Sequence, residues 1–461
     1  MVEFKHTLLA LTVAMGLGAC AVGPDYQRPA SPLPQQFGEN TDSKAAVDAQ
    51  WWKQFKDAQL DQLIDAALAH NTDIQKALAR IEESDAVLRE ATATLFPQID
   101  LDASGNRSRV TTTGSNPVST PVRNNFRGAF SASWELDIWG KARRGKEYAD
   151  AQAQSSRYAK DALALSLAGN VTQTYLTLRS LDALIVIARD SLNSRRESLD
   201  LTSRRNKGGI ASQLDVQQAT LSVANVQRQL LTLQQQRALT EQQLALLTGQ
   251  LGLQIASGDI RSLPLPTTPP AGLPSQLLEA RPDVRQAESD LIAANARIGV
   301  AKANLFPAIS LTGSFGGESR ELNDLMTSGS RIWAGGVGLH LPVFDFGRLS
   351  ARTDQTVAQQ KQLLANYQRS VQNAFVDVNN ALIKVRHSAD MEAAAQSAVN
   401  AADSTLKLAN IRYNAGYSQF LEVLIAQGTY NDAWLNLIQE KRDRLLATVE
   451  LYKAIGGGWQ S

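Results

Sequence analysis

The sequence predicts an α+β membrane protein that is built from two similar halves. Three observations support this fold class. Three motifs occur twice at nearly constant spacing, short segments alternate apolar and polar residues, and long segments carry apolar residues with a seven-residue period. Alternation with a period of two is typical of strands, and a seven-residue period is typical of coiled-coil helices. Each half is therefore expected to combine strands with long helices.

The first 19 residues are predicted to be a secretion signal. Residues 7–19, TLLALTVAMGLGA, form an apolar run that is too short to cross a membrane as a helix. The sequence Leu-Gly-Ala-Cys at 17–20 contains the only cysteine of the chain and resembles a bacterial lipobox, in which the cysteine becomes the acylated N-terminus. Cys20 is therefore the predicted lipidation site, and an ordinary signal with an incidental cysteine is the alternative. The next residue is Ala21 rather than Asp, which by the sorting rules of Gram-negative lipoproteins favours the outer membrane.

Residues 20–59 are expected to form a lipidated N-terminal tether, since residues 21–50 are rich in Pro, Ser and Gln. The 46 Lys and Arg residues nearly balance the 45 Asp and Glu residues, so the net charge of +1 provides no basic field for nucleic acid. After the signal, no apolar run approaches the roughly 18 residues of a transmembrane helix. A membrane crossing would require a closed β-barrel, because lipid cannot satisfy open backbone hydrogen bonds.

The rest of the chain contains an internal repeat. Three motifs return with offsets of 207 to 210 residues: ATATLFPQIDLDASG at 91–105 as AKANLFPAISLTGSFG at 301–316, LDIWGKAR at 136–143 as VFDFGRLSA at 343–351, and RNKGGIASQLDV at 205–216 as RYNAGYSQFLEV at 412–423. They delimit a first structural repeat at 60–260, a Pro-rich linker at 261–274, a second repeat at 275–455 and a C-terminal tail at 456–461. Each repeat is predicted to form a helix, two strands, a long helix, a turn and a helix.

The predicted strands have one apolar and one polar face. The apolar faces carry Ile99, Leu101, Ala103, Phe126, Gly128, Phe130, Ala132, Trp134 and Leu136 in the first half, and Ile309, Leu311, Phe315, Trp333, Val337, Leu339, Leu341 and Val343 in the second. The residues between them are mostly small or polar. Strands of this kind are typical of membrane barrels, and Trp134, Trp139 and Trp333 could form an aromatic girdle. A soluble antiparallel sheet with one wet face has the same alternation and remains the alternative.

The predicted long helices keep a seven-residue period. In the first half, alternating steps of three and four residues connect Leu167 to Leu199 and Val216 to Leu247, with polar interruptions at Arg195 and Arg237. The second half has the same steps from Leu364 to Val385 and from Leu435 to Tyr452. This period indicates coiled-coil packing. A helix over 141–205 would be about 100 Å long at about 1.5 Å per residue.

Two strands per half give four per chain, which cannot close a membrane barrel alone. Two copies would give a barrel filled by side chains, whereas three would leave an open lumen. The polar faces would line that lumen. The charged and titratable candidates for it are Asp100, Asp102, Arg127, Glu135, Asp137 and His340.

The paired halves and five motifs resemble the outer-membrane efflux lipoproteins of the TolC family, which are channels of tripartite RND-type efflux systems. The motifs are VGPDYQRP, WWKQFKDAQLDQLIDAAL, LLEARPDVRQAE, ANLFPAISL and AIGGGW. The resemblance runs from Cys20 to near Ser461. It implies a homotrimer with a 12-stranded β-barrel in the outer membrane and a long α-helical coiled-coil barrel in the periplasm. It also implies a periplasmic adaptor and an inner-membrane pump as partners.

The resemblance places the turns at 206–212 and 414–418 at a periplasmic tip that acts as a gate. There Gly208, Gly209 and Gly416 would supply the backbone freedom to reverse a helix. The gate residues implied by the resemblance are Asp215 and Tyr413, which match positions of polar links between helices, and Glu422, which matches an acidic constriction residue. Without the resemblance, all three would be interpreted as solvated coil residues. The sequence departs from the family pattern at Ile425, where an Asp is common, and at Gly428, where a basic residue is common.

No catalytic, cofactor or metal site is expected. His70, His340 and His387 lie far apart without metal-ligand spacing, and no Gly-rich phosphate loop opens a helix after a strand. The leading interpretation is a passive export conduit for drugs or toxic compounds. A conduit for copper or silver is an alternative, although the mature chain has only Met326 and Met391. A non-channel coiled-coil envelope lipoprotein is the other.

Overall fold

The computed structural model describes residues 21–30, 34, 37, 48–109, 111, 122–269 and 277–458. The signal and Cys20 lie outside the described residues. The chain divides into two compact units, which are described separately. Unit 1 comprises residues 1–30, 80–156 and 287–367, and unit 2 comprises residues 31–79, 157–286 and 368–461.

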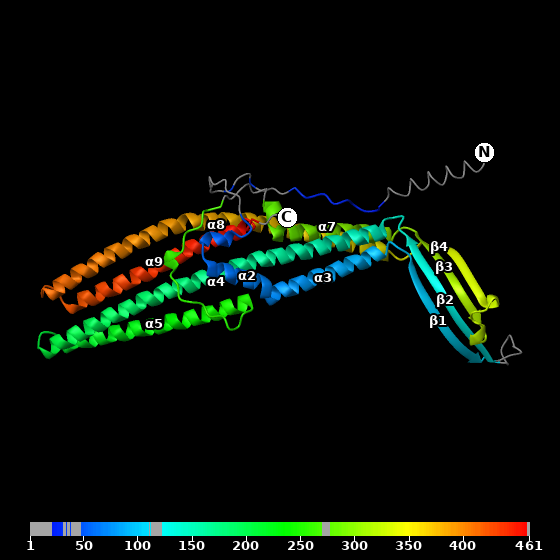
Figure 1. The fold of residues 1–461 in the computed structure, drawn as a ribbon. Helices are drawn as coiled ribbons and strands as arrows, with labels where there is room; N and C mark the ends of the chain where they lie inside the picture. The colour runs from blue at the N-terminus through cyan, green and yellow to red at the C-terminus, as the bar shows by residue number, and fades with distance from the viewer. Residues whose placement is uncertain are drawn as a thin grey trace. The chain divides into compact units, whose positions relative to one another are not determined.

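Unit 1 contains a four-stranded antiparallel sheet in the order β1-β2-β3-β4 (Figure 1). Its strands are β1 (Gln98–Arg109), β2 (Val122–Leu136), β3 (Ala308–Ser319) and β4 (Arg331–His340). Two short 3₁₀ turns, η4 (Leu322–Asp324) and η5 (Ser328–Ser330), lie between β3 and β4. Each half of the sequence thus supplies two strands, as the alternation predicts.

The strand register sorts the side chains into two faces across the whole sheet. Phe130 lies opposite Leu101 on one side and Phe315 on the other, and Phe315 lies opposite Trp333. Directly opposed residues of antiparallel strands project to the same face. The predicted apolar residues of all four strands therefore share one face. In a single chain they are exposed or half-buried; Trp333, for example, is 81% exposed.

The helices follow the order predicted for each half. The first half has α2 (Ala58–His70) and α3 (Thr72–Ala93) before the strands and α4 (Lys141–Lys207) and α5 (Gln213–Thr248) after them. The second half has α6 (Leu277–Ala280), α7 (Pro282–Ala303), α8 (Arg348–Asn414) and α9 (Phe420–Ala454). Among the described residues, none of these helices combines the length and apolar character that a membrane span requires.

The core of unit 2 is built on the seven-residue period. Along α4, every predicted seam residue from Leu167 to Leu192 is buried, and Val226, Leu230 and Leu233 of α5 pack into the same cluster. The core also includes the 3₁₀ helix η1 (Trp51–Phe55), where Trp51 stacks on Tyr452 of α9 with ring centroids 5.3 Å apart. The folded core therefore begins before residue 60, within the segment 20–59 that was predicted to be a tether.

In unit 1, the motif VGPDYQRP lies extended against the helices rather than free. The backbone N–H of Val22 donates to the carbonyl of Trp139 at 2.9 Å, and Arg144 Nη2 lies 2.5 Å from Asp25 Oδ1. Glu288 of α7 accepts from Tyr26 at 3.0 Å and from two nitrogens of Arg28 at 2.6 and 2.9 Å. The segment that directly follows Cys20 is thus attached to the same unit as the sheet.

Candidate functional site

The polar face of the sheet gathers most of the predicted lumen residues. Asp100 lies opposite Ser131, and Arg127 lies opposite Ser104 and Glu318. Asp102 accepts a hydrogen bond from Ser131 at 2.9 Å. Glu135 pairs with Lys141 at 3.0 Å at the end of the strand. In β3 and β4 this face is mainly small, with Ser310 opposite Gly338 and Thr312 opposite Gly336, and it ends at His340. Together these residues form one polar face of the sheet, on which the charged strand residues and His340 are exposed.

Asp137 requires a correction. The alternation continues through it in the sequence, but β2 ends at Leu136. The carboxylate of Asp137 instead accepts from the backbone N–H groups of Ala142 and Arg143, both at 2.9 Å, and from the Arg143 side chain at 3.1 Å. These N–H groups open α4 and lack intrahelical partners, so Asp137 fixes the start of the helix. Leu341 and Val343 likewise lie beyond the end of β4.

The two tip turns have the same backbone geometry in both repeats. Gly209 and Gly416 adopt positive φ values of 75° and 80°, where a side chain would be strained. The residue after each glycine donates its N–H back into the preceding helix, Ile210 to the Arg205 carbonyl at 2.8 Å and Tyr417 to the Arg412 carbonyl at 2.9 Å. This is a helix-ending motif of the Schellman type. Gly208 has no positive φ, so Gly209 alone carries the reversal of the first turn.

At the tip, Arg205 of α4 connects the two helical hairpins of the chain, α4–α5 and α8–α9. Its guanidinium lies 4.7 Å from the ring centroid of Tyr413, and its Nη2 donates to Asn414 Oδ1 at 3.3 Å. Tyr413 also packs on Phe420 at 5.5 Å. A cation–π contact of this kind contributes about 0.5–1 kcal/mol at an exposed site. Arg205 therefore connects α4 to the end of α8.

Within one chain, Asp215 and Glu422 have other partners than Tyr413. Asp215 forms a capping box with Ser212, in which each backbone N–H donates to the other residue's side chain at 3.0 and 3.1 Å. Glu422 lies 4.0 Å from Arg412. Ile425, at the position where the resemblance expects an acid, is 61% exposed. A single chain does not bring the predicted gate residues into one cluster.

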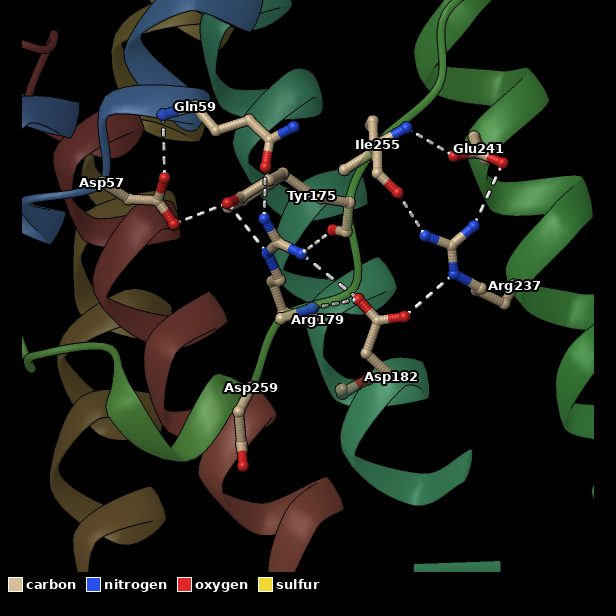
Figure 2. Close-up of polar contacts among 12 residues, drawn as sticks. Asp57, Gln59, Tyr175, Arg179, Asp182, Arg237, Glu241, Ile255 and Asp259 are labelled. Atoms are coloured by element: carbon tan, nitrogen blue, oxygen red, sulfur yellow. Dashed lines mark hydrogen bonds and ion pairs between the residues drawn. The ribbon is translucent and has the colours of Figure 1, made fainter. Parts of the chain in front are cut away.

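A buried polar network holds α2, α4, α5 and the segment after α5 together in unit 2 (Figure 2). Arg179 of α4 donates to the Tyr175 hydroxyl at 2.8 Å, to Gln59 Oε1 at 2.5 Å and to the Ala256 carbonyl at 2.6 Å. The Tyr175 hydroxyl donates in turn to Asp57 at 2.5 Å. Burial is the main cause that raises the pKa of Tyr175 above its ordinary value, so this donor stays protonated.

Asp182 is the centre of this network. Its side chain is 2% exposed and lies between Arg179 Nη1 at 3.2 Å and Arg237 Nε at 2.9 Å. It also accepts the backbone N–H of Gly258 at 3.0 Å. Arg237 further donates to Glu241 at 3.1 Å and to the Ile255 carbonyl at 2.6 Å. Buried charges that are paired and hydrogen-bonded in this way fix the position of the segment over α4 and α5.

Comparisons with known proteins agree with this geometry. The family model described as outer membrane efflux protein matches residues 63–250 and again residues 273–457, one match for each repeat. The chain belongs to the outer membrane efflux protein family. It is 34% identical to the solvent efflux pump outer membrane protein SrpC of Pseudomonas putida, over 99% of both chains. It is 32% identical to the cation efflux system protein CusC of Escherichia coli, over 98% of this chain and 99% of that one.

The fold of this outer membrane efflux protein also matches solved channels. The outer-membrane channel OprN superposes with a TM-score of 0.90 at 29% identity, over 96% of this chain and all of that one. The fold is that of the family's trimeric channels, in which a β-barrel is combined with a long helical barrel. The protein is the outer-membrane channel component of a tripartite efflux system and not an enzyme. Channels of this family work with an adaptor and an inner-membrane pump.

Several contacts of this efflux protein could not be predicted from its sequence. Arg205 lies in a quoted motif, but its partner Tyr413 is more than 200 residues away. Asp182 and Arg179 have no local signal, although Arg237 interrupts the apolar period of α5 and so marked a polar contact. Among the described residues, no group of three His, Cys, Asp or Glu side chains could hold a metal ion.

Proposed function

We propose that three copies of the chain close their sheets into one barrel whose polar face lines the export path and whose apolar face contacts lipid. The observation that carries this proposal is the register, which aligns the apolar residues of all four strands. An isolated four-stranded sheet would leave side chains such as Phe315, Val337 and Leu339 in water, where they are 62–75% exposed. Lipid would cover them in a closed barrel. The lumen residues are then Asp100, Asp102, Arg127, Glu135 and His340.

The tip turns form the gate of this conduit. Arg205, Tyr413 and Asn414 connect the two hairpins of each chain. Of the two predicted gate carboxylates, Glu422 is exposed and Asp215 is half-buried. The exposed carboxylate of Glu422 is available to neighbouring copies. An RND-type pump and its adaptor supply the driving force, since channels of this family work with an adaptor and an inner-membrane pump.

Small toxic organic compounds are the proposed cargo, since the relative SrpC is named for solvent efflux. Metal ions are the second candidate, because the similarly related CusC is named for cation efflux. The two methionines of the mature chain, Met326 and Met391, are exposed and lie far apart in the sequence. A conduit need not bind its cargo, so growth assays must decide between the two classes.

The experiment exchanges two neighbouring strand residues for arginine in a strain that lacks the gene. Phe130→Arg places a charge on the lipid face and should cost about 2–4 kcal/mol near the bilayer centre. We expect it to abolish assembled trimer and resistance. Ser131→Arg, on the opposite face, should assemble and shift the ion selectivity of the channel towards anions. Growth with organic solvents and with copper salts identifies the cargo class. If both variants assemble equally well, the assignment of the faces is wrong.

Lipidation of Cys20 is part of the same proposal. The supporting observation is the attachment of residues 22–28 to unit 1, which would hold an acylated residue 20 close to that unit. Each buried methylene of an acyl chain contributes about 0.8 kcal/mol to anchoring. The intact mass of the mature protein should correspond to a chain that starts at Cys20 and carries acyl groups. An unmodified mass, or a different first residue, would contradict the lipid anchor.

A further inference from the structure

Arg195 of α4 and Arg237 of α5 each interrupt the seven-residue apolar period of their helix. Arg237 is paired with carboxylates, whereas Arg195 is not. Arg237 lies between the carboxylates of Asp182 and Glu241 and also donates to a backbone carbonyl. Arg195 is more deeply buried, at 8% exposure, yet no carboxylate among the described residues lies within ion-pair distance of it. Its one hydrogen-bond acceptor in the described part of the chain is the Ser222 hydroxyl. A buried arginine without a counter-charge is rare.

The charge of Arg195 is therefore uncompensated. Burial is the larger effect and lowers its pKa, while the field of Asp432 acts in the opposite direction without contact. A guanidinium has five N–H donors, of which Ser222 engages one. Buried polar groups in native proteins are nearly always satisfied, and exceptions often indicate a bound ion or molecule.

Asn431 of α9 is a second unsatisfied group at the same place. It is 6% exposed, and its amide oxygen Oδ1 has no hydrogen-bond partner among the described residues. A half-turn of the amide about its terminal torsion would present the donor Nδ2 at this place instead. The neighbouring Gln427 uses its Nε2 to donate to Ser198 of α4 at 3.0 Å, which leaves its Oε1 without a partner in the described chain. An unpaired donor of Arg195 and unpaired acceptors of Gln427 and Asn431 thus lie where α4, α5 and α9 meet.

Arg195 and Asn431 line a pocket of about 590 Å³ between these three helices. Val226 and Leu233 of α5 give it an apolar wall, and Gly428 of α9 keeps it open, since a Cβ added there would meet no atom within 4 Å. Arg228 and Asp432 are exposed at its margin. A pocket of this size with an apolar wall and a few polar groups is typical of small-molecule sites.

We propose that this pocket binds a small organic carboxylate, which accepts hydrogen bonds from the Arg195 guanidinium and from Asn431 Nδ2 and packs its apolar body on Val226 and Leu233. A carboxylate provides both the missing charge and planar acceptors that match a guanidinium. The bound molecule bridges the α4–α5 hairpin and α9. The site goes beyond the role as a conduit, because it gives the helical part of the protein a ligand.

The test uses the full-length trimer in detergent and observes 4-fluorobenzoate by fluorine NMR, with empty micelles as the blank. The uncharged 4-fluorobenzyl alcohol is the matched probe. We expect saturable line broadening for the carboxylate and only the micelle background for the alcohol. Equal broadening of both probes, or none above the blank for the carboxylate, would overturn the proposal and leave water as the occupant.

Three variants locate the site. Arg195→Gln should weaken binding at least about tenfold, because it removes the charge and the fork of donors. Gly428→Leu should also abolish binding, because it fills the pocket while Arg195 stays. Arg228→Gln, the matched change at the margin, should alter affinity less than about twofold. Equal losses in Arg195→Gln and Arg228→Gln would show unspecific attraction and refute the site. Single-channel conductance reports on the conduit separately, so failure of one proposal is distinguishable from failure of the other.

Discussion

Replacing Asp182 by alanine should lower the free energy of unfolding by about 3–5 kcal/mol, because breaking a buried ion pair leaves uncompensated charge in the core. Asp182 is the acceptor for Arg179, Arg237 and the Gly258 N–H, and its side chain is 2% exposed. Without the Asp182 carboxylate between them, the guanidinium groups of Arg179 and Arg237 repel each other. The segment over α4 and α5 should loosen as well. The midpoint of denaturant unfolding of the purified trimer, followed by tryptophan fluorescence, measures the effect.

Asp200→Ala is the matched control for this experiment. Asp200 lies on the same helix and pairs with Arg204 at 2.6 Å, but the two side chains are 65% and 70% exposed. Exposed pairs of this kind contribute about 0–1 kcal/mol, so the control should unfold close to the native midpoint. Similar shifts in the two variants would mean that the buried network adds little to stability.

Replacing Arg205 by alanine should open the tip and raise single-channel conductance. The variant loses the cation–π contact with Tyr413 and the hydrogen bond to Asn414, which connect the two hairpins of each chain. At about 1 kcal/mol per copy, three copies would shift the equilibrium between closed and open tips by roughly a hundredfold. Conductance of the trimer in planar bilayers measures this, and antibiotic influx into intact cells is a second measure.

Two neighbouring substitutions separate this contact from a change in net charge. Arg204→Ala removes the same charge, but Arg204 pairs with Asp200 on its own helix. Its conductance should match that of the native channel. Tyr413→Phe keeps the aromatic ring that Arg205 contacts. The closed tip should therefore keep most of the stability that contacts within one chain give it. If Arg204→Ala opened the channel as much as Arg205→Ala, the gate would respond to overall charge rather than to this contact.

The order of the elements and the sorting of their faces could be predicted from the sequence. Alternation with a period of two and apolar residues with a period of seven are local properties of the sequence. Because the two halves repeat the same motifs, the prediction for one half also supports the prediction for the other. Local patterns were less reliable where elements end. The alternation continues through Asp137, yet its carboxylate caps α4, because the free N–H groups of a helix start compete successfully for an acceptor.

The sequence by itself determined that Arg195 and Arg237 interrupt two apolar seams, because a charged residue in an apolar period is visible without a structure. Only the tertiary structure decided that Arg237 is paired with carboxylates and that Arg195 is not. Asp182 and the backbone at Ile255 reach Arg237 from separate segments of the chain, whereas the helices around Arg195 bring Ser222 and a pocket. The same holds for Arg205 and Tyr413 at the tip. Partners of a buried charge come from residues distant in sequence, and a periodic pattern contains no information about which distant residues the packing brings together.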